Sequence, residues 1–256
     1  AETLNIEYRI PSTLKKNNEE FEYFKSIEAD IAIVVAYGQI IPKEFLGLTK
    51  KGFINIHASL LPKWRGAAPI QRSIMNLDKE TGISIMKIEE NLDTGPVCNS
   101  YKIEIGKNDN TKTMSEKLSL LASEKILNNL DNILDNNLKF KEQNHSQATY
   151  AKKIKKEEGK IDWNDIAKNI IGKINGLYPI PGAWFLYSGV RYKVLKAEVC
   201  EGVSTPGEVL DNYLIISCKD KSIKILEIQR EGKRPQNINE FILGSQIKKG
   251  TNINNV

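Results

Sequence analysis

Two polar side chains interrupt an otherwise apolar segment in the first third of the chain. Asn55 and His57 stand two positions apart in residues 52–57 (G-F-I-N-I-H), whose length and apolar content predict a buried strand. Side chains two positions apart lie on the same face of a strand. A buried amide or imidazole without a hydrogen bond costs about 1–3 kcal/mol. The pair is therefore either two satisfied core side chains or the polar part of a functional site.

A carboxylate follows the next predicted strand. Asp93 lies in the turn Asp-Thr-Gly after a strand predicted at residues 82–88, and Glu89 and Glu90 are alternatives for the same role. A carboxylate beside an imidazole stabilises the imidazolium and selects its tautomer. An amide, an imidazole and a carboxylate together suit acyl transfer, because they can stabilise the negative charge that develops on a carbonyl oxygen.

Other chemistries lack their sequence patterns. The chain contains no glycine-rich motif for a dinucleotide or a nucleoside triphosphate, and no G-x-S-x-G hydrolase motif. Its three cysteines, Cys98, Cys200 and Cys218, are widely spaced, so we expect neither a disulfide framework nor a metal site. His145 lies in a polar stretch, and we assign it no catalytic role.

The elements around these residues alternate between helix and strand. Their order predicts a doubly wound α/β domain to about residue 138, with its ligand site outside the carboxyl ends of the strands. The run I-A-I-V-V-A at residues 31–36 predicts a strand buried on both faces of a parallel sheet. Thr-Met-Ser-Glu at 113–116 predicts the capping box of a long helix. Two further helices are predicted at 17–27 and 67–77.

The second part of the chain has a different pattern. Residues 139–158 are polar and lack apolar periodicity, which predicts an inter-domain linker. A helix is predicted at 164–176, and the short segments after it are typical of a small β-barrel or sandwich. We expect a frayed tail at 250–256. The predicted strands lie at 183–187, 190–199, 207–210, 213–217 and 223–228.

Charge also separates the two parts. Residues 1–150 contain 19 Lys and Arg against 20 Asp and Glu, whereas residues 151–256 contain 18 against 12. The positive excess favours a polyanionic partner, although a lysine-rich surface can also serve solubility alone. No apolar run approaches the roughly 18 residues of a membrane span, and no signal segment opens the sequence. We therefore expect a cytoplasmic protein without a membrane partner.

Several segments resemble those of a known family. Residues 55–71 (N-I-H-A-S-L-L-P-K-W-R-G-A-A-P-I-Q) closely resemble the signature stretch of the methionyl-tRNA formyltransferases, and all folate-dependent formyltransferases share its N-x-H-x-S-L-L-P core. L-D-T-G at 92–95 is similar to the second active-site element of that family, and V-A-Y-G-Q-I-I-P at 35–42 to the segment beside its folate pocket. In the second part, K-I-D-W at 160–163 and Y-P-I-P-G-A-W at 178–184 resemble the C-terminal domain of the family.

This resemblance implies a fold. It implies a Rossmann-like, doubly wound formyltransferase domain over residues 1–138, a linker over 139–158 and a smaller oligonucleotide-binding (OB)-like β-barrel domain over 159–256 that binds tRNA. We expect a monomer. The family also starts with another β-α-β unit that carries a glycine-rich turn and a basic loop. The sequence has no counterpart of either, so we expect that it lacks the N-terminal segment of the family pattern.

The resemblance also implies an activity. It is the transfer of a formyl group from 10-formyltetrahydrofolate to the α-amino group of methionyl initiator tRNA, for translation initiation and without a metal. Asn55 would donate a hydrogen bond to the formyl oxygen, His57 would stabilise the developing charge and manage the proton, and Asp93 would hold His57 and relay a proton. The residues implied in folate binding are Tyr37, Gly38, Ile40, Ser59, Leu60, Leu61 and Pro62.

Two other functions remain open from the sequence. A folate-dependent formyltransferase or hydrolase could act on a small-molecule acceptor, but such an acceptor needs no basic domain. A nucleic-acid-binding protein without activity would explain the basic part of the chain, but it would leave Asn55 and His57 without a role.

Overall fold

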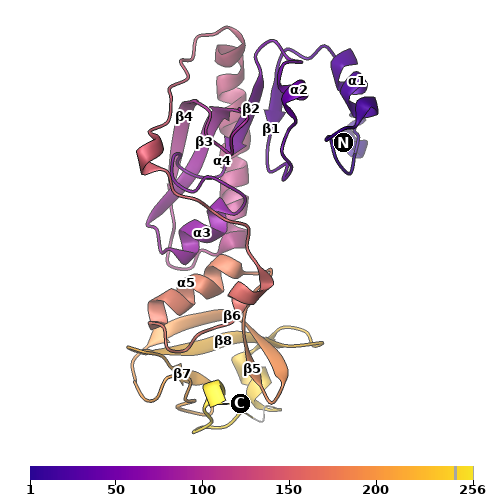
Figure 1. Cartoon of the computed structure of the whole chain (residues 1–256). Helices are drawn as coiled ribbons and strands as arrows, with labels where there is room; N and C mark the ends of the chain where they lie inside the picture. The colour runs from indigo at the N-terminus through magenta and orange to yellow at the C-terminus, as the bar shows by residue number, and fades with distance from the viewer. Residues whose placement is uncertain (245–246, 256) are drawn as a thin grey trace. The chain divides into compact units, whose positions relative to one another are not determined.

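The computed structural model describes residues 1–244 and 247–255, and the chain divides into two compact units (Figure 1). We describe each unit by itself, and the predicted domain boundaries stay predictions. Unit 1 consists of Ala1–Ala67, Gly82–Tyr101 and Leu120–Thr149, and unit 2 of Ala68–Thr81, Lys102–Ser119 and Tyr150–Val256.

A four-stranded sheet carries the residues of chemical interest. Its strands are β1 (Ala32–Val34), β2 (Phe53–His57), β3 (Glu80–Lys87) and β4 (Val97–Glu104), which lie side by side in chain order. β1 and β2 are parallel, whereas β2 and β3 are antiparallel, so the sheet is mixed. The three strands that we predicted in this region are confirmed, and β4 is an additional one.

The prediction that the first strand is buried on both faces is wrong. In β1 and directly after it, Ile33 is 38% exposed and Val35 is 54% exposed. The described sheet places β1 at its edge, where it pairs with β2 alone. An apolar run predicts the strand itself, but it does not reveal how many neighbours the strand has.

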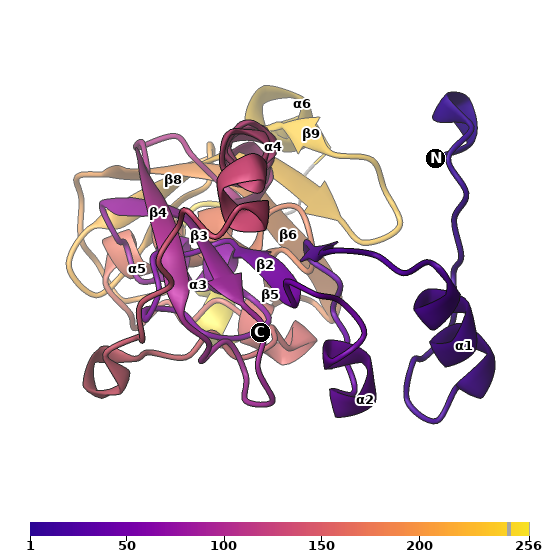
Figure 2. The ribbon, with the colours of Figure 1, turned by 90° about the horizontal axis from the view of Figure 1, so that it is seen from above.

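Helices cover the sheet of unit 1 or lie at its periphery. α1 (Asn18–Ser26) confirms the predicted helix and begins at Asn17, whose side chain accepts a hydrogen bond from the Glu20 amide. Its Phe24 ring lies 5.5 Å from the ring of Phe53 on β2, and α1 stands at the periphery of this unit in both views (Figures 1 and 2). The short α2 (Lys43–Leu46) follows β1.

The long predicted helix is present, but its cap differs. α4 (Thr111–Leu134) begins before the predicted box. Asn110 and Thr113 cap it reciprocally: the Thr113 amide donates to Asn110 Oδ1 at 3.1 Å, and the Asn110 amide donates to Thr113 Oγ1 at 3.0 Å. The predicted box at 113–116 is therefore wrong by one turn. Further along α4, Ile133 packs with Ile54 and Ile85 in a buried cluster of unit 1.

Unit 2 is built on an antiparallel sheet. The sheet has the order β5-β6-β8-β7, and β9 pairs with β8. These strands are β5 (Ala183–Tyr187), β6 (Val190–Cys200), β7 (Ile215–Ser217), β8 (Ser222–Arg230) and β9 (Gln236–Asn237). The unit also contains α3 (Pro69–Met75), α5 (Ala167–Leu177) and α6 (Ile238–Ile242). Short 3₁₀ helices lie at Glu2–Leu4, His145–Gln147, Lys156–Gly159 and Ile253–Asn255.

Most of the predicted elements of unit 2 are confirmed. Ser188 and Gly189 have φ of 48° and 73°, as a two-residue hairpin turn between β5 and β6 requires. The strand predicted at 207–210 is wrong, because only isolated bridges form there, from Glu208 to Asn252 and from Val209 to Ile216. The frayed tail is also wrong for the described residues: Ile253 is 4% exposed and belongs to the core of this unit. Val256 lies outside the described residues.

Candidate active site

Strand β2 presents the amide and the imidazole on the same face. Asn55 lies opposite Met86 of β3 and beside Val34 of β1, and His57 lies opposite Ser84. The two side chains share a face because they are two positions apart in a regular strand. His57 is 6% exposed, whereas Asn55 is partly accessible.

The His57 ring has a defined orientation. Its Nε2 lies 2.9 Å from the backbone oxygen of Trp64. A carbonyl oxygen can only accept, so Nε2 carries a proton and donates it. The other ring nitrogen, Nδ1, then faces Asp93 Oδ2 at 3.7 Å. This separation is too long for a direct hydrogen bond but short enough to stabilise an imidazolium.

Among the three candidate carboxylates, Asp93 is the one that the structure brings to His57. Its Oδ2 accepts a hydrogen bond from the Gly66 amide at 2.7 Å. Glu89 is exposed, and Glu90 forms an ion pair with Lys43 instead. Asp93 has φ of 51°, a left-handed conformation that Asp tolerates better than most residues.

The turn that holds Asp93 needs a glycine. A Cβ on Gly95 would lie 2.0 Å from the backbone oxygen of Lys87, at the end of β3. The turn therefore packs directly against the strand backbone, and only a residue without a side chain fits there.

The Asn55 amide is available for a ligand. None of the side-chain hydrogen bonds formed among the described residues involves it. A partly accessible amide without a protein partner can both donate and accept hydrogen bonds.

The residues implied in folate binding form two segments of unit 1. In the first, the Ser59 hydroxyl donates to the backbone oxygen of Lys63 at 2.6 Å, and Ser84 Oγ joins the loop to β3 by donating to the Ser59 oxygen and accepting from the Leu61 amide. Leu60, Leu61 and Pro62 are half-buried. The second segment follows β1 and consists of exposed residues. These are Tyr37, Gly38 and Ile40.

A buried polar network contacts the backbone of the Asp93 turn, and the sequence did not predict it. Arg65 is 2% exposed, and its Nε and one terminal nitrogen donate to Gln143 Oε1 at 3.1 and 2.7 Å. The same terminal nitrogen lies 3.1 Å from Nδ1 of His145. Gln143 Nε2 donates to the backbone oxygens of Asp93 and Gly95 at 2.9 and 2.7 Å. No local pattern distinguishes Gln143 from the other polar residues of 139–158.

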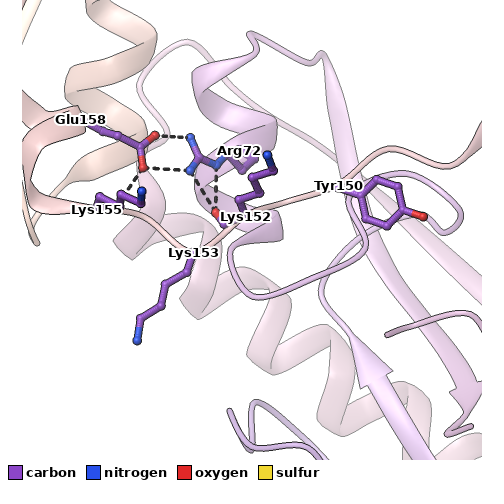
Figure 3. A pocket seen from close by; sticks show the side chains of 6 residues that line it. All are labelled: Arg72, Tyr150, Lys152, Lys153, Lys155 and Glu158. Atoms are coloured by element: carbon purple, nitrogen blue, oxygen red, sulfur yellow. Dashed lines mark hydrogen bonds and ion pairs between the residues drawn. The ribbon is translucent and has the colours of Figure 1, made fainter. Parts of the chain in front are cut away.

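Unit 2 contains a basic pocket (Figure 3). Arg72 of α3 holds it together by donating to both carboxylate oxygens of Glu158, at 2.6 and 3.1 Å, and to the backbone oxygen of Lys152. The Arg72 guanidinium lowers the pKa of Glu158. The residues that line the pocket are Arg72, Tyr150, Lys152, Lys153, Lys155 and Glu158.

Residues 1–244 and 247–255 contain neither a candidate membrane span nor a candidate metal centre. In this part of the chain, no helix combines the length and the apolar character needed to cross a bilayer. Within the same residues, no group of three or more His, Cys, Asp or Glu side chains is arranged to hold a metal ion.

Two family models place this chain among the formyltransferases. The family model described as "Formyl transferase" matches residues 4–130, and "Formyl transferase, C-terminal domain" matches residues 153–246. The methionyl-tRNA formyltransferase of Pelagibacter ubique is 66% identical over 257 residues, in an alignment that covers 100% of this chain and 83% of the relative. The chain belongs to the methionyl-tRNA formyltransferase family.

Solved structures support the fold. HypX from Aquifex aeolicus in complex with tetrahydrofolic acid matches 92% of this chain and 44% of its own length, with a TM-score of 0.69 and 18% identity. WlaRD, a sugar 3N-formyl transferase, matches 82% of this chain and 77% of its own length, with a TM-score of 0.66 and 22% identity. The predicted family and α/β fold class are confirmed, whereas the closure of the second sheet into an OB-like barrel stays a prediction.

Proposed function

We propose that this protein transfers the formyl group of 10-formyltetrahydrofolate to the α-amino group of methionyl initiator tRNA, as a cytoplasmic monomer that acts in translation initiation. The observation that carries the proposal is the 66% identity, over the whole chain, to a relative named for this activity. The polar groups on β2 and in the Asp93 turn supply the chemistry that such a transfer needs.

The residues of the candidate site are of the types that could bind 10-formyltetrahydrofolate. When bound, 10-formyltetrahydrofolate supplies the carbonyl carbon that the amine attacks. The Asn55 amide has no partner among the described residues, as a group that must bind a formyl oxygen requires. Exposed Tyr37 and Ile40, at 39% and 84%, offer apolar surface to a flat ring, and Gly38 and residues 59–62 would complete this folate site.

Each member of the site has a distinct role in the proposal. Asn55 donates a hydrogen bond to the formyl oxygen as negative charge develops on it, and loss of one such donor costs about 10²–10³ in rate. His57 accepts a proton from the attacking amine at Nδ1, the ring nitrogen that Trp64 leaves free, and gives a proton to N10 of the folate as the bond between N10 and the formyl carbon breaks. Asp93 stabilises the resulting imidazolium across 3.7 Å, either directly or through a water molecule.

The basic pocket is our candidate for contact with the tRNA. Lys152, Lys153 and Lys155 line it, and they lie in the part of the chain that carries the positive excess. Lys156 is exposed next to them. Ammonium groups on a segment whose backbone is held in place attract the phosphates of a polyanion and release its counterions.

A formylation assay tests the proposed function. The purified protein is incubated with 10-formyltetrahydrofolate and methionyl initiator tRNA, and formyl-methionyl-tRNA is measured by acid-gel electrophoresis. Methionine alone and an amino sugar nucleotide serve as small acceptors, each tested at low and high salt. We expect product with the tRNA only, and a rate that falls steeply with salt at low tRNA concentration. Formylation of a small acceptor in place of the tRNA would contradict the proposal.

A further inference from the structure

We propose that Gln143, oriented by the buried Arg65, is a positioning residue that fixes the Asp93 turn relative to His57. This inference rests on the proposed function, because it assigns Gln143 to the same reaction. Gln143 touches neither substrate in the proposal. It acts through the backbone of the turn.

The amide of Gln143 spans the turn from one end to the other. Its two N–H bonds go to the backbone oxygens of Asp93 and Gly95, at 2.9 and 2.7 Å. Gln143 itself is 8% exposed, so water competes little for these bonds. One buried side chain therefore sets the spacing and the direction of two carbonyl groups in a three-residue turn.

Arg65 determines which way this amide points. Arg65 is 2% exposed, and its guanidinium donates twice to Gln143 Oε1. Within the described residues, its side-chain hydrogen-bond partners are neutral: Gln143 and His145. A buried cation needs acceptors, so the amide oxygen must face Arg65 and the amide nitrogen must face the turn.

Three consecutive residues link this network to the catalytic ring. Trp64 accepts the Nε2 proton of His57 through its backbone oxygen, Arg65 orients Gln143, and the Gly66 amide donates to Asp93 Oδ2. Segment 64–66 therefore touches both partners of the His57–Asp93 pair. Gln143 bonds both to Arg65 and to the turn that carries Asp93, so it connects segment 64–66 to that turn a second time.

The turn needs this support on its exposed side. Residues 89–92, which lead into it, are exposed, and Leu92 is 58% exposed. Asp93 itself has a left-handed backbone conformation. This conformation costs free energy and persists only where the surrounding structure holds it. The 3.7 Å between His57 Nδ1 and Asp93 Oδ2 leaves little tolerance, because a displacement of about 1 Å can cost a factor of 10² in rate.

The Gln143→Glu variant tests the inference. Glutamate keeps an oxygen for Arg65 but loses both N–H donors, and the guanidinium beside it keeps it ionised. We expect kcat to fall by about 30- to 100-fold, while KM for 10-formyltetrahydrofolate and for methionyl-tRNA changes by less than about threefold. A rise in KM with unchanged kcat would overturn the positioning role.

Asn129→Asp is the matched control. Asn129 is a buried amide of α4 in the same unit, 6% exposed, and its Nδ2 also donates twice, to the Tyr101 hydroxyl and the Lys125 oxygen. Its Oδ1 also accepts one bond, from Asn99. Both variants lose two buried N–H donors, but the Tyr101 hydroxyl can turn to donate to the new carboxylate at position 129, whereas the Asp93 and Gly95 carbonyls cannot donate. We expect Tm to fall in both variants, but kcat should fall only in Gln143→Glu. Equal losses of kcat would mean that Gln143 acts through stability alone.

A double-mutant cycle with Asp93→Asn separates failure of the inference from failure of the proposed function. If Gln143 acts through Asp93, Gln143→Glu costs almost nothing further in an Asp93→Asn background, whereas independent effects would multiply and overturn the inference. Wild-type protein that formylates no methionyl-tRNA would instead refute the proposed function.

If Gln143→Glu does not fold, Arg65→Lys is tested in the same cycle. Lysine keeps the charge but loses the paired donors, and we expect kcat to fall by about tenfold or less. In an Asp93→Asn background, Arg65→Lys should cost almost nothing further.

Discussion

The His57 site and the basic pocket differ in how far their side chains are buried and in how firmly those side chains are held. His57 is buried, and the backbone of Trp64 and the turn at Asp93 hold its surroundings in place. The pocket instead presents lysines that are exposed, and one ion pair fixes only their backbone. Interactions in a buried site depend on geometry and are weakly screened, whereas those of exposed charges depend on number and on salt. Substitutions in the two regions should therefore change different kinetic quantities.

The largest effect is expected at the buried site. His57→Ala removes the proposed proton acceptor beside Asp93, so we expect kcat to fall by about 10³-fold or more. The affinity for tRNA, measured by filter binding, should change by less than about twofold. An activity within about tenfold of the wild type would contradict the role proposed for His57.

A smaller effect is expected from the exposed lysines. Changing Lys152, Lys153, Lys155 and Lys156 to Gln should weaken tRNA binding by about 10- to 100-fold and lower the slope of log K against log salt by about three, with kcat at saturation unchanged. The measurement is a salt titration of binding.

Four exposed lysines of unit 1 give a matched control for this charge change. They are Lys15, Lys16, Lys25 and Lys139. Neutralising them should leave the salt slope within about one of the wild type. If both quadruple variants behaved alike, the pocket lysines would serve solubility only.

A third prediction concerns the ion pair beneath the lysines. Arg72→Ala frees the backbone of Lys152 and the carboxylate of Glu158, so we expect KM for tRNA to rise by about three- to tenfold with kcat unchanged. Arg191→Ala is the control, because it also removes one positive charge from unit 2 but stacks on Trp184 instead. The same rise in both variants would assign the effect to net charge.

The smallest effect is one of stability. The pKa of Glu158 is lowered, first of all by its bond to Arg72, so its contribution is present above the ordinary glutamate pKa and is lost as the pH falls through the lowered value. Glu158→Gln should lower Tm by about 2–4 °C at pH 7, and the difference should vanish in acid, once the pH lies below the lowered pKa of Glu158. Thermal melts at both pH values test this, and a difference that persists in acid would exclude the ion pair as its cause.

The parts of the site that are local in sequence could be predicted. The shared face of Asn55 and His57 follows from the two-residue period of a strand, and Asp93 follows from its place after β3. The family resemblance implied Asp93, but residue spacing alone could not exclude Glu90, because Lys43, which pairs with Glu90, lies far away in the chain.

The parts that depend on distant partners could not be predicted. Gln143 lies 50 residues after Asp93 and has no periodic or motif context, so only the folded chain shows that it supports the turn. Ile253 shows the same limit, since a short polar tail gives no sign that it contributes a core residue. The burial of β1 was overestimated because hydrophobicity does not report whether a strand lies at the edge of a sheet.

The bond from His57 Nε2 to the Trp64 oxygen leaves Nδ1 as the ring nitrogen that can exchange protons with a ligand. A proton that enters at Nδ1 must leave from Nδ1, so the imidazole cannot pass protons through from one nitrogen to the other. The Nε2 hydrogen of a ring that is 6% exposed should therefore exchange slowly with deuterated water. It would provide a downfield NMR resonance that reports directly on the tautomer while the enzyme is at rest.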